Sequence, residues 1–234
     1  MIGIIGGAGV AATNKLQELI ETELTLNGAY RDCHHPEMII WQATKVPSRS
    51  MFLEGKGESF IPGYIDIAKK LKQAGASKIA MCCNTAHYAI DEISRESKVP
   101  FINLIEEVCK TVKENNIKSV GIVASDGCVK TKIYDKYLRR LCPDINIIYP
   151  DDNFQIEVTR GICNIKNIHR FDAPLSKDNP INIFKSIKQH LIEKGAESVI
   201  IGCTDIRVGY YDQSNIDSLE VLKESILREY KNNE

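Results

Sequence analysis

KQAGASKIAMCCN, at residues 72–84, recurs as IEKGAESVIIGCT at residues 192–204, an offset of 120 residues. Each copy contains the end of an amphipathic segment, a Gly-Ala turn, a run of apolar residues and a cysteine. A second pair, IGIIG at residues 2–6 and VGIVA at residues 120–124, is offset by 118 residues. A repeat of this length predicts two similar units, each of which begins with a buried strand and later places a cysteine at a strand end.

Short apolar runs alternate with longer amphipathic stretches along the whole chain, which is typical of an α/β fold with parallel sheets. Apolar residues at helical spacing around Leu16, Ile65 and Ile183 predict covering helices. We therefore predict two similar α/β lobes that face each other across a pseudo-two-fold axis, with the active site in the cleft between them. The predicted strands are 2–5, 38–41, 79–83, 101–104, 120–124, 145–149 and 199–203.

The division between the lobes is not expected at the middle of the chain. Little sequence follows Cys203, and it ends in an amphipathic segment around Leu219, Leu222 and Ile226. We expect this last helix to return to the first lobe. The predicted domains are therefore 1–106 together with 208–234, and 107–207.

The composition excludes several classes of partner. The 234 residues are 43% hydrophobic and 26% charged with a net charge of -1, so no basic surface is predicted to hold a nucleic acid. No apolar run approaches the roughly 18 to 20 residues of a membrane span, and no basic region precedes the first apolar stretch as in a signal peptide. These features predict a cytoplasmic protein that binds neither nucleic acid nor membrane.

The eight cysteines are interpreted as reduced thiols, because they are sparse in a long chain and Cys82 and Cys83 are adjacent. No C-x-x-C pair is present, so the spacing of a zinc ribbon or of a thioredoxin-like site is missing. Cys33-His34-His35 lacks a second pair of ligands and is interpreted as a loop. No metal is predicted.

The glycine-rich stretch Gly6-Gly7-Ala8-Gly9 follows the first strand and offers backbone N–H groups to an anion at a helix start. We expect Gly9 to contact the substrate there. The same stretch fits a G-x-G-x-x-A dinucleotide fingerprint, but the second strand ends in Trp41-Gln42 and supplies no acid for a ribose. The anion-binding interpretation is therefore preferred.

Cys83 and Cys203 are both predicted at the carboxyl edge of a parallel sheet, where ligands bind. If the lobes face each other, the two thiols lie on opposite sides of one cleft, about 7 to 8 Å apart if each must approach one carbon within about 3.5 Å. One thiolate then removes a proton from one face of a carbon and the opposite thiol returns a proton to the other. A helix N-terminus beside each cysteine is expected to lower its pKa. Either cysteine alone is more typical of a buried core residue; their equivalence carries the hypothesis.

Other candidates are ambiguous by position. Arg49 follows the second strand and is able to bind a carboxylate, yet its position is typical of a solvated loop residue. Lys166 is typical of a surface lysine. His87 is more typical of a structural histidine than of a proton carrier, and Cys82 is expected to pack in the core.

The segments Cys83-Asn84-Thr85-Ala86-His87 and Gly202-Cys203-Thr204 resemble the two cysteine motifs of the aspartate/glutamate racemases, which work without pyridoxal phosphate. Segments 2–9, 46–49, 124–127 and 165–166 support this resemblance over essentially the full chain. It implies flavodoxin-like lobes, a homodimer, no cofactor and a small acidic amino acid as substrate. By this resemblance Cys83 and Cys203 are the catalytic bases and Arg49 and Lys166 bind substrate carboxylates. The amino-acid head is then bound by Asn84, Thr85, Ser125 and Thr204.

Four residues depart from the family pattern, which commonly has Met at Ala8, Pro at Val10, Thr at Cys128 and Glu at Asp205. Because these positions line the expected pocket, the choice among aspartate, glutamate and another acidic amino acid stays open. Two alternative functions also stay open. One is a related cysteine-dependent enzyme, such as a maleate isomerase, a hydantoin racemase or an arylmalonate decarboxylase. The other is a protein that binds an acidic ligand without turnover.

Overall fold

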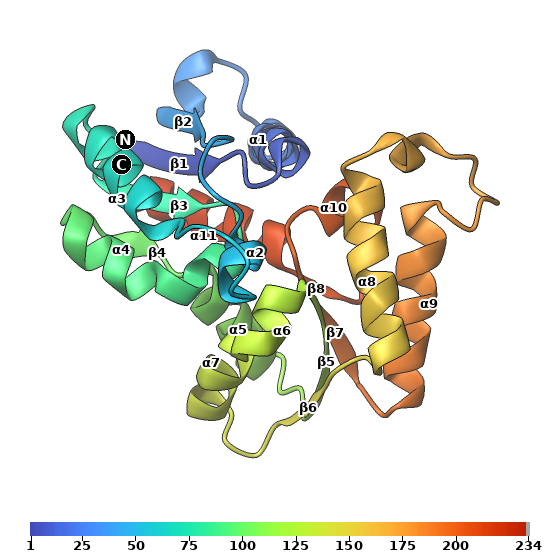
Figure 1. Cartoon of the computed structure of the whole chain (residues 1–234). Helices are drawn as coiled ribbons and strands as arrows, with labels where there is room; N and C mark the ends of the chain where they lie inside the picture. Colours follow the sequence, from blue (N-terminus) through green and yellow to red (C-terminus); the bar gives the residue numbers. More distant parts are fainter. Residues whose placement is uncertain (233–234) are drawn as a thin grey trace.

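Two parallel four-stranded sheets organise the computed structural model, which describes residues 1–232 (Figure 1). The first sheet has the order β2-β1-β3-β4 and the second the order β6-β5-β7-β8. The two orders are equivalent, which confirms the predicted α/β class and the two similar lobes. In the first sheet the strands are β1 (Ile2–Gly6), β2 (Met38–Gln42), β3 (Lys78–Met81) and β4 (Phe101–Ile102). In the second they are β5 (Ser119–Ala124), β6 (Asn146–Ile148), β7 (Ser198–Gly202) and β8 (Ile216–Asp217).

Helices cover and connect these sheets in both halves of the chain. The first half contains α1 (Val10–Leu26), η1 (Asp32–His34), α2 (Arg49–Leu53), α3 (Ile61–Gln73), η2 (Thr85–Ala89), α4 (Ile90–Ser97) and α5 (Leu104–Glu114). The second contains α6 (Asp126–Thr131), α7 (Ile133–Leu141), α8 (Asp152–Ile165), η3 (Ile168–Phe171), α9 (Pro180–Glu193), α10 (Ile206–Gly209) and α11 (Ser218–Lys231). Within residues 1–232, no helix has both the length and the apolar character needed to cross a bilayer.

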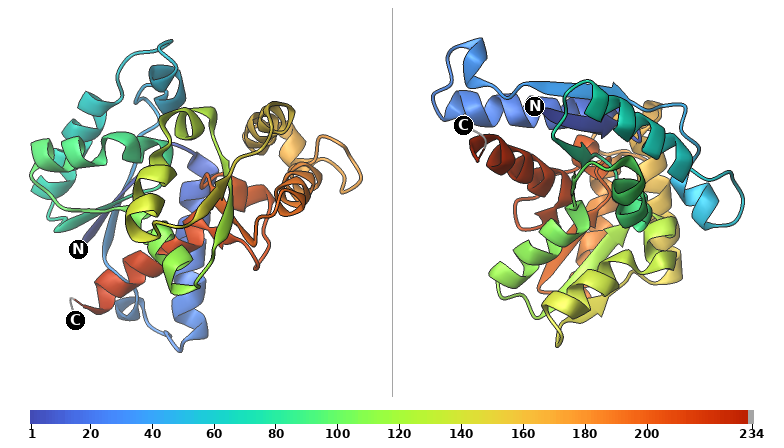
Figure 2. Two further views of the ribbon diagram at one scale, coloured as in Figure 1. Left: turned by 90° about the horizontal axis from the view of Figure 1, so that it is seen from below. Right: turned by 90° about the vertical axis from the view of Figure 1, so that its left-hand side faces the viewer.

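Helices α5 and α11 each follow the last strand of one sheet and pack on a helix of the other lobe. Helix α5 follows β4 of the first sheet but packs on α7, whereas α11 follows β8 of the second sheet and packs on α1. The two helices also pack on each other, and Figure 2 shows α11 running beside α1. The predicted domain boundaries stay a prediction. The short strand β8, which the sequence analysis did not anticipate, pairs with β7 in the second sheet although it lies within 208–234.

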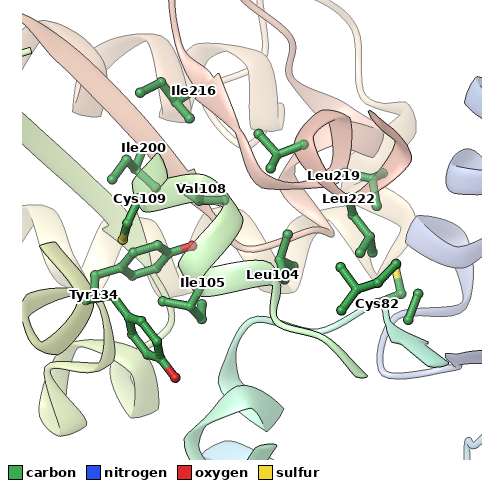
Figure 3. Close-up of a cluster of buried hydrophobic side chains, with 14 of the residues drawn as sticks. Cys82, Leu104, Ile105, Val108, Cys109, Tyr134, Ile200, Ile216, Leu219 and Leu222 are labelled. Carbon is green, nitrogen blue, oxygen red and sulfur yellow. The ribbon is translucent and has the colours of Figure 1, made fainter. Parts of the chain in front are cut away.

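One buried cluster joins the lobes through these helices. It combines Cys82 of the first lobe, Leu104 of α5, Ile200 of β7 and Leu222 of α11 (Figure 3). Apolar contact between the lobes removes their facing surfaces from water, which stabilises their mutual orientation. Cys82 lies in this core, as its position next to Cys83 predicted.

Strands β3 and β7 end before the cysteines rather than at them. The strands were expected over 79–83 and 199–203, but β3 ends at Met81 and β7 ends at Gly202. The Cys82 N–H still donates to Ile5 O, at 2.9 Å, but the Cys83 N–H turns back to Met81 O, at 2.9 Å. The turn breaks the ladder, so Cys83 lies in a loop at the carboxyl edge of the sheet.

Candidate active site

Cys83 and Cys203 occupy equivalent loops, directly beyond the carboxyl ends of β3 and β7. Cys83 is 7% exposed and Cys203 is partly exposed. The two sulfurs are close enough that negative charge on Cys83 raises the pKa of Cys203. The structure therefore places both thiols in one electrostatic environment. Their expected separation of about 7 to 8 Å stays a prediction.

Arg49 begins α2 and lies beside Cys83, so it is not the solvated loop arginine that its position suggested. Its Nη1 donates to Pro47 O, at 3.3 Å, and its Nη2 to Ala8 O, at 3.4 Å. Burial lowers the pKa of Arg49, but interactions with Cys83, Tyr64 and Asp205 outweigh burial and raise it. The buried Nε has no hydrogen-bond partner in the part of the chain that the structure describes. Arg49 thus has a donor left for an anion.

Lys166 directly follows α8 and forms an ion pair with Asp205, which lies two residues after Cys203. The Nζ atom lies 2.8 Å from Asp205 Oδ2, and the exposed side-chain fractions are 49% for Lys166 and 3% for Asp205. Burial lowers the pKa of Lys166, but Asp205 and Cys203 outweigh burial and raise it. In this structure the carboxylate that Lys166 binds is therefore the chain's own. Its predicted contact with a substrate carboxylate stays a prediction.

Glycines of one lobe contact the cysteine loop of the other. A Cβ added to Gly9 would lie 1.7 Å from Asp205 Oδ1, and a Cβ added to Gly127 would lie 3.2 Å from Thr85 Cγ2. Gly9 has an extended backbone, with φ at -174°, so its requirement is space rather than a special conformation. The lobes thus approach each other through two small residues, one beside each cysteine loop.

Three of the predicted head-binding hydroxyls make contacts between the lobes. Thr85 Oγ1 lies 2.8 Å from Ser125 Oγ and 3.4 Å from Cys128 Sγ. Thr204 Oγ1 donates to Cys82 O, at 3.4 Å. The structure therefore brings these residues to the cysteine loops, and their contacts with a substrate stay predictions.

Asn84 is held by internal hydrogen bonds on both ends of its carboxamide. Its Nδ2 donates to Ser218 Oγ, at 2.9 Å, and its Oδ1 accepts from Tyr134 Oη, at 2.6 Å. These bonds connect the Cys83 loop to α11 and α7. An amide retains one further N–H and one further lone pair, so its predicted contact with substrate also stays a prediction.

His87 fixes the backbone of the Cys83 loop. Its Nδ1 lies 2.8 Å from Cys83 O, and its Nε2 accepts from the Leu104 N–H, at 3.1 Å. This pair of contacts requires a neutral ring with the proton on Nδ1. Burial lowers the pKa of His87 to about 4. His87 therefore has the structural role that was favoured over proton transfer.

The expected lowering of the pKa is wrong for Cys203. Burial raises the pKa of this thiol well above its ordinary value, and Asp205 raises it further. Lys166 and the Asp205 N–H oppose this change without reversing it. The helix that follows, α10, has only four residues. Cys203 is therefore held as a neutral thiol.

One backbone N–H of the glycine-rich stretch 6–9 already has a hydrogen-bond partner in its own lobe. The Gly7 N–H donates to Thr13 Oγ1, at 3.0 Å, and Gly7 has φ at +78°. That N–H is engaged, which leaves fewer donors for an anion than the sequence suggested. Among the family departures, Ala8 and Cys128 are buried, whereas Val10 is exposed at the start of α1.

Tyr64, on α3, is a site residue that the sequence analysis missed. Its side chain is fully buried in one cluster with Cys83, and its hydroxyl has no hydrogen-bond partner among residues 1–232. Burial raises the pKa of Tyr64, and negative charge on Cys83 raises it further. Tyr64 shares a helix face with the apolar residues Ile67, Ala68 and Leu71, so its spacing is typical of the core. The sequence pattern therefore held no signal for this contact.

A cluster of potential metal ligands lies in the α8–α9 loop of the described chain. Suitable atoms of His169, Asp172 and Asp178 lie within 4.8 Å of one another. His169 Nδ1 is 2.9 Å from Asp172 Oδ2, and Arg160 Nη1 is 2.6 Å from Asp178 Oδ1. These contacts account for the grouping. The predicted absence of a metal stays a prediction.

Comparison with known proteins yields one family over most of the chain. The model of the Asp/Glu/Hydantoin racemase family matches residues 2–220. The broad specificity amino-acid racemase RacX of Bacillus subtilis is 27% identical over 207 residues, which are 88% of this chain and 86% of RacX.

Two solved structures share the fold. Aspartate racemase from Picrophilus torridus is 24% identical with a TM-score of 0.76, covering 98% of this chain and 94% of the other. An aspartate racemase homologue from Pyrococcus horikoshii is 24% identical with a TM-score of 0.73, covering 98% of both chains. At these identities the structural likeness shows the two-lobed fold and nothing about substrate.

Proposed function

The chain belongs to the Asp/Glu/hydantoin racemase family, and from that premise we propose that it interconverts the L- and D-forms of an amino acid without pyridoxal phosphate. The two bases are the thiols of Cys83 and Cys203. The observation that carries this proposal is their equivalence. Each cysteine follows the third strand of its sheet in chain order, and both thiols interact electrostatically with Lys166.

The two cysteines enter the reaction in different protonation states. A two-base reaction needs one thiol and one thiolate, and burial raises the pKa of Cys203, so we assign Cys203 as the proton donor of the resting form and Cys83 as the base. The Cys83 thiolate takes the Cα proton, and the electron pair of the broken C–H bond stays on the substrate as a carbanion. The Cys203 thiol then donates its proton to the opposite face, which inverts the centre and leaves the charges exchanged. The reverse reaction starts from that form.

The carbanion requires positive charge and positioned donors, since a Cα proton is a much weaker acid than a thiol. The half-buried Arg49 supplies a cation that interacts with Cys83, and its Nε has no hydrogen-bond partner among residues 1–232. Thr85, Ser125 and Thr204 supply hydroxyls at the two cysteine loops. We assign Arg49 to a substrate carboxylate and these hydroxyls to the amino-acid head.

Aspartate and glutamate are the proposed substrates, with Arg49 and Lys166 as the cations that favour a dicarboxylic amino acid. Asp205 offsets the charge of Lys166, and the relative RacX is described as having broad specificity. Neutral and basic amino acids therefore belong in the same screen. A homodimer and a cytoplasmic location are part of the proposal.

The direct test is incubation of the pure protein with each L- or D-amino acid in heavy water, without added pyridoxal phosphate. Racemisation by two bases introduces deuterium at Cα of the product and generates the opposite enantiomer. Chiral chromatography and mass spectrometry follow both events. If no amino acid gains deuterium or inverts, the proposed function is wrong.

Single cysteine variants separate a two-thiol mechanism from other routes. In Cys203→Ala the remaining thiolate still removes and returns the Cα proton of one enantiomer, so that enantiomer exchanges without inversion. Cys83→Ala should exchange the other enantiomer. Cys109→Ala, at a buried position of α5 that has no part in the proposed reaction, is the matched control and should retain inversion. Retained inversion in either active-site variant would contradict the two-thiol mechanism.

A further inference from the structure

One carboxylate oxygen of the buried Asp205 has no hydrogen-bond partner among residues 1–232. Its Oδ2 is paired with Lys166 at 2.8 Å, whereas Oδ1 has no hydrogen-bond partner in the described part of the chain. The side chain is 3% exposed, so water does not replace the missing donor at the surface. An unpaired carboxylate oxygen in such a position costs free energy, because ionised groups are strongly stabilised by donors.

Contacts from both lobes hold this carboxylate in place. Lys166, at the end of α8, holds one oxygen, and the other lies against Gly9, where the first lobe has no side chain to occupy the space. Asp205 also lies in the loop that carries Cys203, and its charge acts on Arg49 beside Cys83. The unpaired oxygen therefore lies against the first lobe beside the Cys203 loop, within electrostatic range of the half-buried Arg49.

The chemistry of the unpaired groups is complementary to an amino acid. Among residues 1–232, Arg49 Nε is a donor without a partner and Asp205 Oδ1 is an acceptor without a partner. A carboxylate satisfies the first and an ammonium group satisfies the second. We infer that Asp205 Oδ1 accepts a hydrogen bond from the α-ammonium group of the substrate, while Lys166 positions Asp205. This inference rests on the proposed function. It means that Asp205 makes the site bind amino acids more tightly than the corresponding acids that lack the amino group.

The alternative is a structural role in which Asp205 does no more than hold Lys166 for a substrate carboxylate. The two roles differ in one respect. If Asp205 binds the ammonium, its loss weakens the binding of an amino acid and spares the acid that lacks the amino group. If Asp205 holds Lys166, both ligands lose affinity together.

The experiment measures binding by titration calorimetry in the inert double variant Cys83→Ser/Cys203→Ser. The ligands are the amino acid that exchanges best with the wild-type protein and its des-amino acid, for example L-aspartate and succinate. Asp205→Asn is expected to weaken amino-acid binding about tenfold to a hundredfold, as for loss of a charged hydrogen bond. The affinity for succinate should change by less than about threefold. Asp205→Glu restores an acceptor and should recover part of the discrimination.

Glu157→Gln, which removes a carboxylate paired with Arg160 on α8, is the matched control and should change neither affinity. Parallel losses for both ligands in Asp205→Asn, or no loss for either, would overturn the inference while leaving racemisation by the wild-type protein intact. If no amino acid exchanges deuterium in the wild-type protein, the proposed function fails and this inference fails with it. Thermal melting of each variant verifies that it is folded.

Discussion

Lys166 Nζ lies 2.8 Å from Oδ2 of the buried Asp205, and this ion pair joins the end of α8 to the loop that carries Cys203. The two partners have opposite effects on the pKa of Cys203, since Asp205 raises it and Lys166 lowers it. The pair thus sets the charge beside one of the two proposed bases. Substitutions of the two residues should consequently have opposite effects on the ionisation of Cys203.

We predict that Asp205→Asn lowers the pKa of Cys203 and that Lys166→Met raises it. Removing the carboxylate takes away a charge that opposes the thiolate, whereas removing the ammonium takes away one that stabilises it. The pH dependence of Cys203 alkylation by iodoacetamide, read by peptide mass spectrometry, should move to lower pH in the first variant and to higher pH in the second. Movement in the same direction would contradict this electrostatic account. Alkylation of the exposed Cys33 provides the internal control.

Gly9→Ala should reduce racemisation at least about tenfold, because its Cβ would lie 1.7 Å from Asp205 Oδ1 and small misplacements of site groups are costly. The same clash should lower the melting temperature. The double variant Gly9→Ala/Asp205→Ala removes the obstructing carboxylate and should recover most of the lost stability without recovering activity. Failure of the second substitution to restore the melting temperature would show that the clash is not the cause.

Tyr64→Phe and Tyr134→Phe form a matched pair with opposite expected effects on stability. Tyr64 has a buried hydroxyl without a partner among residues 1–232, so its removal should keep or raise the free energy of unfolding, by up to about 1 kcal/mol. Tyr134 donates to Asn84 at 2.6 Å, so its removal should cost about 1 to 2 kcal/mol. Urea unfolding measures both. Because Tyr64 lies beside Cys83 and Arg49, its variant should also lose activity despite its retained stability.

His87 should make folding stability fall in acid. Its pKa is about 4 in the folded protein and about 6.5 in an unfolded chain, so the unfolded state binds more protons between these values. The contribution is present above about pH 6.5 and is lost progressively as the pH falls toward 4, to a total of about 3 kcal/mol. His87→Asn should be less stable at pH 7 and should show a shallower decline. Urea unfolding at pH 7 and pH 4.5 tests this. An equal loss of unfolding free energy between the two pH values in the wild-type protein and the variant would contradict the prediction.

The internal repeat shows which features of the fold can be predicted from local sequence patterns. The match between residues 72–84 and 192–204 identified both lobes and both cysteines, because strand patterning and Gly-Ala turns are local properties that survive in each copy. The same patterning placed Cys82 in the core. It set the strand ends two residues too late at Cys83 and one too late at Cys203, since the backbone turn there depends on hydrogen bonds and not on apolar character.

The packing of the helices and the contacts of the site residues depend on segments that are far apart in the chain. The amphipathic pattern around Leu222 indicates a helix, but the packing of α5 and α11 on the other lobe depends on which apolar surfaces meet after folding. Asp205 was visible as a departure from a family pattern, yet its pairing with Lys166 and its contact with Gly9 join three separate segments. Tyr64 was indistinguishable from a core residue. Sequence by itself determined which residues lie near the strand ends, to within two positions. The tertiary structure alone decided their partners, because burial, charge and hydrogen bonding act through space.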